Sequence, residues 1–166
     1  KEMEHDACGV GLVASTEGKK SRAIVEYGIE ALKAVWHRGA VDADGKTGDG
    51  AGIHVEIPKD FFIEKIQVTG HDYDNSEICV GMIFLPRNDY SAQENCKTIV
   101  ESELTKNNFS IYGWRQVPVN PKVLGEKALQ TMPEIIQVLF KSNDPNLIDK
   151  NLERKIYETR KKIENK

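Results

Sequence analysis

The first apolar run of the chain opens on a cysteine and contains two glycines, and this decides where a first strand can begin. It reads Cys8-Gly9-Val10-Gly11-Leu12-Val13-Ala14, whereas the seven residues before it are polar and show no core pattern. The run predicts a strand from Cys8, and its glycines allow other backbone to approach closely. A thiol at this point suits a nucleophile beside an open pocket. The residues alone favour the commoner alternative, in which Cys8 is a small buried side chain.

Charge and cysteine content limit the possible partners and compartment. The 166 residues suit a single domain. Lys and Arg number 23 against 26 Asp and Glu, and the net charge of −3 gives no basic surplus for nucleic acid or an anionic membrane. The odd, widely spaced cysteines, Cys8, Cys79 and Cys96, form neither a disulfide framework nor a metal pair, which indicates a reducing compartment. Without an apolar signal segment or a membrane-length run, we expect a cytoplasmic protein.

A helix is predicted over residues 21–37. Ser21 suits its N-cap, and Gly39 suits the stop after its end. Apolar residues recur at spacings of four, three and four, which is typical of a helix with one face in the core. This stripe consists of Val25, Ile29, Leu32 and Trp36.

A glycine-rich loop follows at residues 38–52, which hold five glycines and three aspartates. This composition excludes regular structure, and long loops of this kind are often functional. In residues 53–57, Ile53, Val55 and Ile57 alternate with polar side chains, as in a strand with one face in the core. We expect this strand to pair with residues 8–14, with the 21–37 helix packed over both.

The rest of the chain predicts further strands and helices. An almost continuous apolar run at residues 78–85 predicts a strand buried on both faces. The periodicity predicts two more strands, at residues 109–117 and 135–140, and helices at residues 91–106 and 152–163. A short helical piece is expected to begin at residues 60–62. Together these elements predict an α+β fold, with antiparallel strands in two sheets and helices outside.

Three familiar motifs fail in their context. Residues 9–14 fit Gly-x-Gly-x-x-Ala, but the dinucleotide fingerprint follows a strand and opens a helix, whereas here a strand follows. Residues 45–47 resemble the end of a phosphate-binding loop, which needs a glycine where Ala40 stands and a helix afterwards. His5 and Cys8 could bind a metal, but the other histidines are scattered and zinc takes three or four protein ligands. No metal site is expected.

The cysteine run and the glycine-rich loop together resemble the class II glutamine amidotransferases, which are N-terminal-nucleophile hydrolases. More narrowly, the chain is similar to the start of the glutaminase domain of the glutamate synthase large subunit. Residues 4–11 match that subfamily's precursor junction, and residues 37–40 and 44–52 match its long loop. Weaker matches at residues 123–126, 131–133 and 153–155 extend the resemblance over nearly the whole chain.

The resemblance implies an αββα sandwich of the N-terminal-nucleophile hydrolase type. Residues 1–7 would be a leader, and residues 8–166 the front part of a type-2 glutamine amidotransferase domain. The domain would be incomplete, since the Asn-Gly pair of the family's oxyanion hole has no counterpart in these residues. The implied reaction is hydrolysis of glutamine to glutamate and ammonia through a thioester on Cys8. Once the leader is removed, the α-amino group of Cys8 would act as the base.

Around the nucleophile, the resemblance implies that Arg38 binds substrate. The implied pocket loop consists of Gly9, Gly39, Asp49 and Gly50. The residues leave an equal alternative for Arg38, in which it is a helix-end charge paired with Asp42 or Asp49. The chain itself is expected to bind no cofactor. Flavin mononucleotide and iron–sulfur clusters are implied for a full-length synthase, whose other domains would be its partners.

Two alternatives to the enzyme stay open. One is a non-catalytic binding module on the same scaffold, because later active-site residues are absent. The other is a redox sensor that uses Cys8, although no positively charged run beside it would lower the pKa of its thiol.

Overall fold

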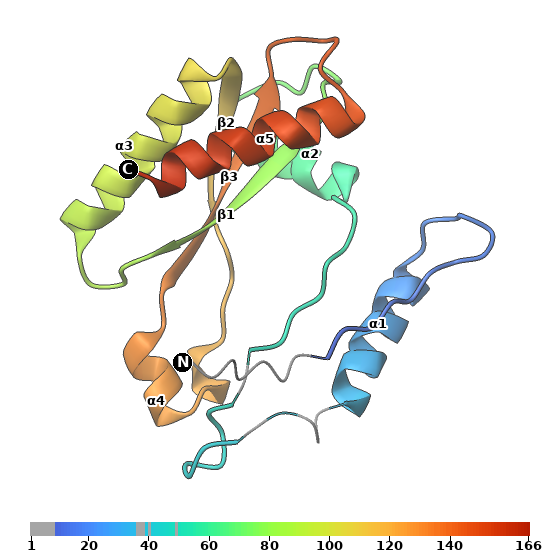
Figure 1. Ribbon diagram of the computed structural model, residues 1–166, viewed down its shortest axis with the longest axis vertical. Helices are drawn as coiled ribbons and strands as arrows, with labels where there is room; N and C mark the ends of the chain where they lie inside the picture. Colours follow the sequence, from blue (N-terminus) through green and yellow to red (C-terminus); the bar gives the residue numbers. More distant parts are fainter. Residues whose placement is uncertain (1–8, 36–38, 40, 49) are drawn as a thin grey trace, which may run out of the picture. The chain divides into compact units, whose positions relative to one another are not determined.

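The computed structural model describes residues 9–35, 39, 41–48 and 50–166 (Figure 1). They form two compact units. The N-terminal unit combines the described chain up to Glu56 with Asn120–Thr131, and the sheet unit combines Ile57–Val119 with Met132–Lys166. The segment 120–131 therefore leaves the sheet unit between two of its strands and belongs with the first part of the chain.

An antiparallel three-stranded sheet forms the centre of the sheet unit. Its strands are β1 (Cys79–Leu85), β2 (Phe109–Gln116) and β3 (Glu134–Ser142), in the order β1-β3-β2. The last strand along the chain lies in the middle, and both outer strands pair with it. All three strands expected in this part of the sequence are confirmed to within two residues at each end. The unit is α+β, as predicted.

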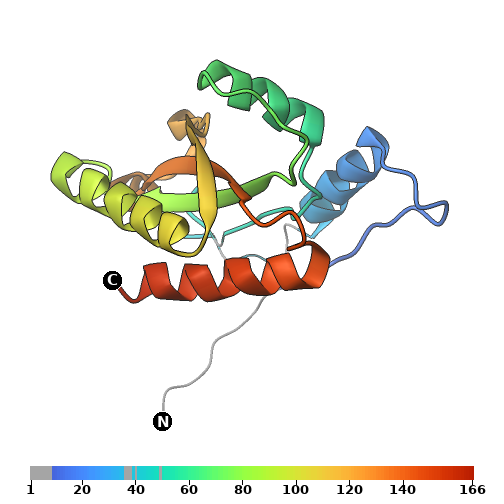
Figure 2. The ribbon, with the colours of Figure 1, turned by 90° about the horizontal axis from the view of Figure 1, so that it is seen from above.

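Two helices cover one face of this sheet. They are α3 (Tyr90–Lys106) and α5 (Asp149–Glu164), which lie on the same side of the strands (Figure 2). The apolar stripes predicted for both helices meet the strands in a single cluster, because alternate strand residues point to this face. The buried members of the cluster are Cys79, Val100, Leu104, Phe109, Val138, Phe140 and Leu152.

The opposite face of the sheet is only partly covered. The helix α2 (Lys59–Val68) lies on it (Figure 2) and packs the fully buried Ile66 against Leu139. Farther along β1, Met82 and Phe84 share that face but remain 47% and 63% exposed. The prediction that this strand is buried on both faces is therefore wrong for its second half, since these two side chains remain exposed.

A β-bulge fastens the end of α2 to the sheet. The pairing of β2 with β3 shifts register between Ile111 and Gly113. The hydroxyl of Thr69, the C-cap of α2, donates to the carbonyl of the intervening Tyr112 at 2.8 Å. Gly113 has a φ of +151°, and a Cβ there would lie 2.7 Å from Thr69 Cγ2. Only glycine suits this close, left-handed position.

In the N-terminal unit, the predicted helix is α1 (Arg22–Ala34), with Ser21 as N-cap although its side chain makes no capping hydrogen bond. Its C-cap is Val35, whose N–H turns to the Lys33 carbonyl. The expected end near His37 with Gly39 as the stop is therefore wrong. Trp36 lies outside the described residues. The described stripe residues Val25, Ile29 and Leu32 are half-buried.

Two expected strands are absent from the described part of the N-terminal unit. Residues 9–14 and 53–57 form no strand, and Val10 is 97% and Ile53 45% exposed. A strand needs a hydrogen-bonded neighbour, and neither segment has one among the described residues. The predicted pairing between them is therefore not found. Ile53 does lie against α1, where a Cβ on Gly28 would be 3.0 Å from its Cδ1.

Candidate functional site

The glycines predicted to line the pocket are described, but three predicted side chains are not. Those outside the described residues are Cys8, Arg38 and Asp49. Gly9, Gly39 and Gly50 are exposed. A Cβ on Gly9 or Gly50 would meet nothing within 4 Å. The close backbone approach predicted beside the cysteine is therefore not found at Gly9.

The glycine-rich loop contains a small hairpin at residues 41–48. Val41 and Gly48 form an antiparallel bridge, and the Asp42 N–H donates to the Thr47 carbonyl at 2.7 Å. Gly45 turns the chain at a φ of +68°, a conformation that glycine adopts without a steric penalty. Along the sequence, the predicted pocket residues stand just outside the bridge on both sides. The hairpin therefore ties the two halves of the predicted pocket loop together.

The carboxylate of Asp44 organises the turn of this hairpin. Its Oδ1 accepts the backbone N–H of Lys46 at 2.9 Å and of Thr47 at 2.7 Å, and its Oδ2 accepts the Thr47 hydroxyl at 2.5 Å. The Thr47 hydroxyl, followed by the two backbone N–H groups, holds the pKa of Asp44 well below its usual range. The N–H of Glu126 acts weakly in the same direction.

The start of α4 (Glu126–Thr131) closes on the hairpin within the same unit. Gly125 is buried, and a Cβ on it would lie 2.1 Å from Thr47 Oγ1 and 2.3 Å from Asp44 Oδ2. The second residue of the helix, Lys127, donates from Nζ to Asp42 Oδ2 at 2.5 Å. These contacts define the α4 clasp, which consists of Asp42, Asp44, Thr47, Gly125 and Lys127.

Sequence reasoning did not find the α4 clasp, because it joins residues about eighty positions apart. A local signal was present on each side. Asp44 stands three residues before Thr47 with Gly45 between them, a pattern typical of a turn in which an Asp side chain accepts hydrogen bonds from the backbone that follows it. Gly125 stands directly before a helical fragment. The carboxylate of Asp42, one of the two partners that the sequence offered for Arg38, pairs with Lys127, and the expected pair with Arg38 lies outside the described residues.

The two described cysteines are free thiols. Cys79 is 4% exposed in the core of the sheet unit, and burial, followed by the charges of Glu77 and Glu153, raises its pKa to about 12. At neutral pH the Cys79 thiol is protonated and a poor nucleophile. Cys96 is half-buried on α3.

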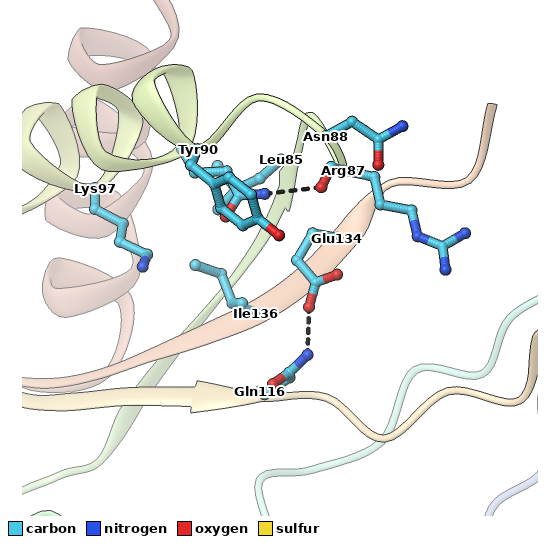
Figure 3. A pocket seen from close by; sticks show the side chains of 9 residues that line it. Leu85, Arg87, Asn88, Tyr90, Lys97, Gln116, Glu134 and Ile136 are labelled. Carbon is cyan, nitrogen blue, oxygen red and sulfur yellow. Dashed lines mark hydrogen bonds between the residues drawn. The ribbon is translucent and has the colours of Figure 1, made fainter. Parts of the chain in front are cut away.

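A surface hollow of about 430 Å³ lies where β1 leads into α3 (Figure 3). Its polar lining mixes both charges, with Arg87 and Lys97 alongside Glu134, which accepts a hydrogen bond from Gln116. The wall near α3 is fixed by Gln93, whose Nε2 donates to the Arg87 carbonyl at 3.2 Å. All the residues that line it belong to the sheet unit, and none of the described pocket-loop glycines is among them.

The described residues contain neither a candidate metal-ligand cluster nor a membrane-length helix. In that part of the chain, no group of three or more His, Cys, Asp or Glu side chains is arranged to hold a metal ion. No helix formed by the described residues is long and apolar enough to cross a membrane.

The family profile described as Glutamine amidotransferases class-II matches residues 8–166. The match begins at Cys8 and includes the hairpin, the α4 clasp and the whole sheet unit. The chain belongs to the class II glutamine amidotransferases. The resemblance found in residues 4–11 and in the glycine-rich loop is thereby confirmed.

Relatives of this amidotransferase chain include large glutamate synthases. The glutamate synthase [NADPH] large chain of Azospirillum brasilense is 54% identical over 163 residues, which cover 98% of this chain and 11% of that protein. Ferredoxin-dependent glutamate synthases of Pyropia yezoensis and Arabidopsis thaliana (synthase 1, chloroplastic/mitochondrial) are 40% and 39% identical. These two matches cover 98% and 97% of this chain and 10% of each relative. The chain thus spans about a tenth of the length of these relatives.

Proposed function

We propose that this chain is the front part of the glutaminase domain of a glutamate-synthase-like protein. The complete domain hydrolyses glutamine to glutamate and ammonia, whereas the 166-residue chain by itself is expected to be inactive or nearly so, because it lacks the family's oxyanion donors. The observation that carries the proposal is the family match, which begins at Cys8. The high identity to the large chain of a glutamate synthase supports the subfamily. Residues 1–7 would be a leader, and residues 8–166 part of the amidotransferase domain.

In the proposed reaction, the Cys8 thiol attacks the side-chain amide carbon of glutamine. A carbon–sulfur bond forms, the carbon–nitrogen bond breaks, and ammonia leaves with a proton relayed by the α-amino group of Cys8. Water then attacks the thioester, which releases glutamate and restores the thiol. The α-amino group suits the role of base because its ordinary pKa, about 7.7 to 8.0, lies close to neutral pH.

This role requires a free amine, so Ala7 must first be separated from Cys8. In the proposed maturation, the Cys8 thiol attacks the Ala7 carbonyl. A carbon–sulfur bond forms and the Ala7–Cys8 carbon–nitrogen bond breaks, which frees the amine, and water then hydrolyses the thioester to release the leader and restore the thiol. Arg38 would bind or orient the substrate. The pocket loop would be formed by Gly9, Gly39, Asp49 and Gly50.

We also propose the αββα arrangement for the complete domain. The supporting observation in the sheet unit is the open face of β1, on which Met82 and Phe84 remain exposed. In the N-terminal unit, apolar residues alternate in the 53–57 segment without a strand partner among the described residues. Both features are typical of layers that complete a sandwich only when a second sheet is present.

We still predict that the partners of this chain are the synthase domains of a longer parent protein. Those domains would hold flavin mononucleotide and iron–sulfur clusters. Cytoplasmic localisation also stays a prediction, which rests on the three widely spaced cysteines.

The decisive experiment is a glutaminase assay on the longest natural protein that carries this sequence. We expect Cys8→Ser to abolish glutamate release from glutamine while the circular dichroism spectrum stays unchanged. Cys79→Ser and Cys96→Ser are the matched controls and should keep activity, since Cys79 is a protonated core thiol and Cys96 lies on α3. Retained hydrolysis in Cys8→Ser would refute the proposed nucleophile, and the absence of hydrolysis in the unaltered protein would favour the non-catalytic module.

Covalent labelling tests the leader. A glutamine analogue with a diazoketone in place of the side-chain amide should modify Cys8 alone, and only in chains whose mass spectrum shows that residues 1–7 are gone. Labelling of Cys79, or full activity in the leader-bearing form, would contradict the N-terminal-nucleophile mechanism.

A further inference from the structure

The α4 clasp contacts the glycine-rich loop at its turn, away from the predicted pocket residues. Among the described residues, the loop is held by the bridge at its base, by Asp44 within the turn, and by the clasp. The Val41–Gly48 bridge is a single isolated pair, which by itself fixes a hairpin only weakly. The orientation of the loop therefore depends on what holds its turn.

Close packing at Gly125 gives the clasp its specificity. The virtual Cβ of Gly125 falls 2.5 Å from the Thr47 backbone nitrogen, as well as on the Asp44 and Thr47 side chains. The backbone at Gly125, just before α4, therefore lies close against the turn, beside the Asp44 and Thr47 side chains and the Thr47 backbone nitrogen. Any residue other than glycine must push the hairpin away from the helix.

Charge adds a second attachment. Asp42 and Lys127 form an ion pair across the clasp, with 31% and 66% of their side chains exposed. Asp42 Oδ1 also accepts the N–H of Ala43 at 2.6 Å, which fixes the carboxylate that receives the lysine. An exposed ion pair of this kind contributes only modestly to stability. The close packing at Gly125 therefore determines the position of the hairpin, and the ion pair makes a smaller contribution to it.

We propose that the α4 clasp is a positioning device for the glutamine pocket: it holds hairpin 41–48 and thereby sets the position of the adjoining pocket-loop residues Gly39 and Gly50. This inference rests on the proposed function. The clasp residues are positioning residues and touch no reacting atom. Displacing the hairpin weakens glutamine binding and slows its attack, because small misplacements of binding groups cost large factors in rate.

The first experiment uses Gly125→Ala in the longest natural protein. We expect kcat/KM for glutamine to fall about tenfold or more, mainly through KM. Glu126→Ala is the matched control, since it changes the next residue yet keeps the backbone N–H and adds no atom at the clasp. It should leave KM within about twofold of wild type.

The second experiment separates the ion pair from general charge effects. Lys127→Met should raise KM about two- to fivefold, the range expected for an exposed pair. Lys127→Arg should restore it, because the charge and a donor remain. Lys122→Met removes the same charge from the same segment and should have no effect on KM.

Two labelling rates distinguish positioning from folding. In Gly125→Ala, labelling of Cys8 by the diazoketone glutamine analogue should slow by the same factor as kcat/KM. Labelling of Cys8 by iodoacetamide, which needs no glutamine pocket, should keep its wild-type rate. If Gly125→Ala slowed labelling by both reagents equally, or left the kinetics of glutamine hydrolysis at wild-type values, the proposal that the clasp positions the pocket would be overturned. Active Cys8→Ser protein would instead overturn the proposed function, so the two failures are distinct.

Discussion

Asp74 holds the loop after α2 against the sheet through three donors. Its Oδ1 accepts the Tyr112 hydroxyl at 2.9 Å and the Ser76 N–H at 3.2 Å, and its Oδ2 binds the Lys141 ammonium group. Lys141, followed by Ser76, holds the pKa of Asp74 well below its usual range. Burial first, and the same carboxylate second, raise the pKa of Tyr112 above its usual range. The cluster therefore persists with an ionised acid and a neutral phenol.

We expect Asp74→Asn to lower the free energy of unfolding of the sheet unit by about 1 kcal/mol at pH 7, a value reduced because 46% of the Asp74 side chain is exposed. An acid whose pKa is lowered on folding stabilises above its unfolded pKa, about 3.9, and loses this effect as the pH falls further. The difference between wild type and variant should be constant from pH 8 to 5 and shrink below about pH 4. Urea unfolding followed by Trp114 fluorescence measures it, with Asp72→Asn as control. A difference that grows on acidification would contradict this assignment.

At the scale of helices and strands, the sequence predicted the sheet unit well because each element carries its own period. The apolar repeats of α3, α5 and the three strands are local patterns that can be recognised without knowing which elements pack against them. Residues 9–14 and 53–57 carry similar patterns but form no strand, because pairing depends on a neighbour that no local pattern specifies. The α4 clasp was missed for the same reason. The roles predicted for Cys8, Arg38 and Asp49, as nucleophile, substrate-binding residue and pocket-loop residue, came from motif resemblance and lie outside the described residues.

The bulge in β2 provides a test at this scale. Gly113→Ala should lower the free energy of unfolding by about 1–3 kcal/mol, since alanine is strained at a φ of +151° and its Cβ would meet Thr69 Cγ2. Thr69→Ser removes that methyl group, so the double variant should recover part of the loss. The rest reflects backbone strain, which no neighbour relieves. Urea unfolding of the four proteins in a double-mutant cycle measures both parts. Full recovery in the double variant would mean that the clash alone requires glycine.

Over the whole molecule, the open face of β1 marks where the described layers stop. On the other face, α3 and α5 bury a continuous cluster, and α2 closes only the part of its own face around Leu139. Met82 lies at the uncovered part, with its sulfur accepting a bond from Gln137 Nε2 at 3.1 Å. Exposed apolar side chains side by side on a sheet favour a covering layer. The proposed sandwich supplies one.

Methionine oxidation reports whether that layer exists. In the separate 166-residue chain, dilute peroxide should convert Met82 to its sulfoxide readily, because 47% of the residue is exposed. In the longer parent protein, a second sheet over β1 should slow this conversion about tenfold or more, since peroxide must reach the sulfur. Met132, which is half-buried outside that face, is the internal reference in both proteins. Peptide mass spectrometry over a time course gives the two rates. If Met82 oxidised equally fast in both proteins relative to Met132, the face would be open and the sandwich proposal would fail.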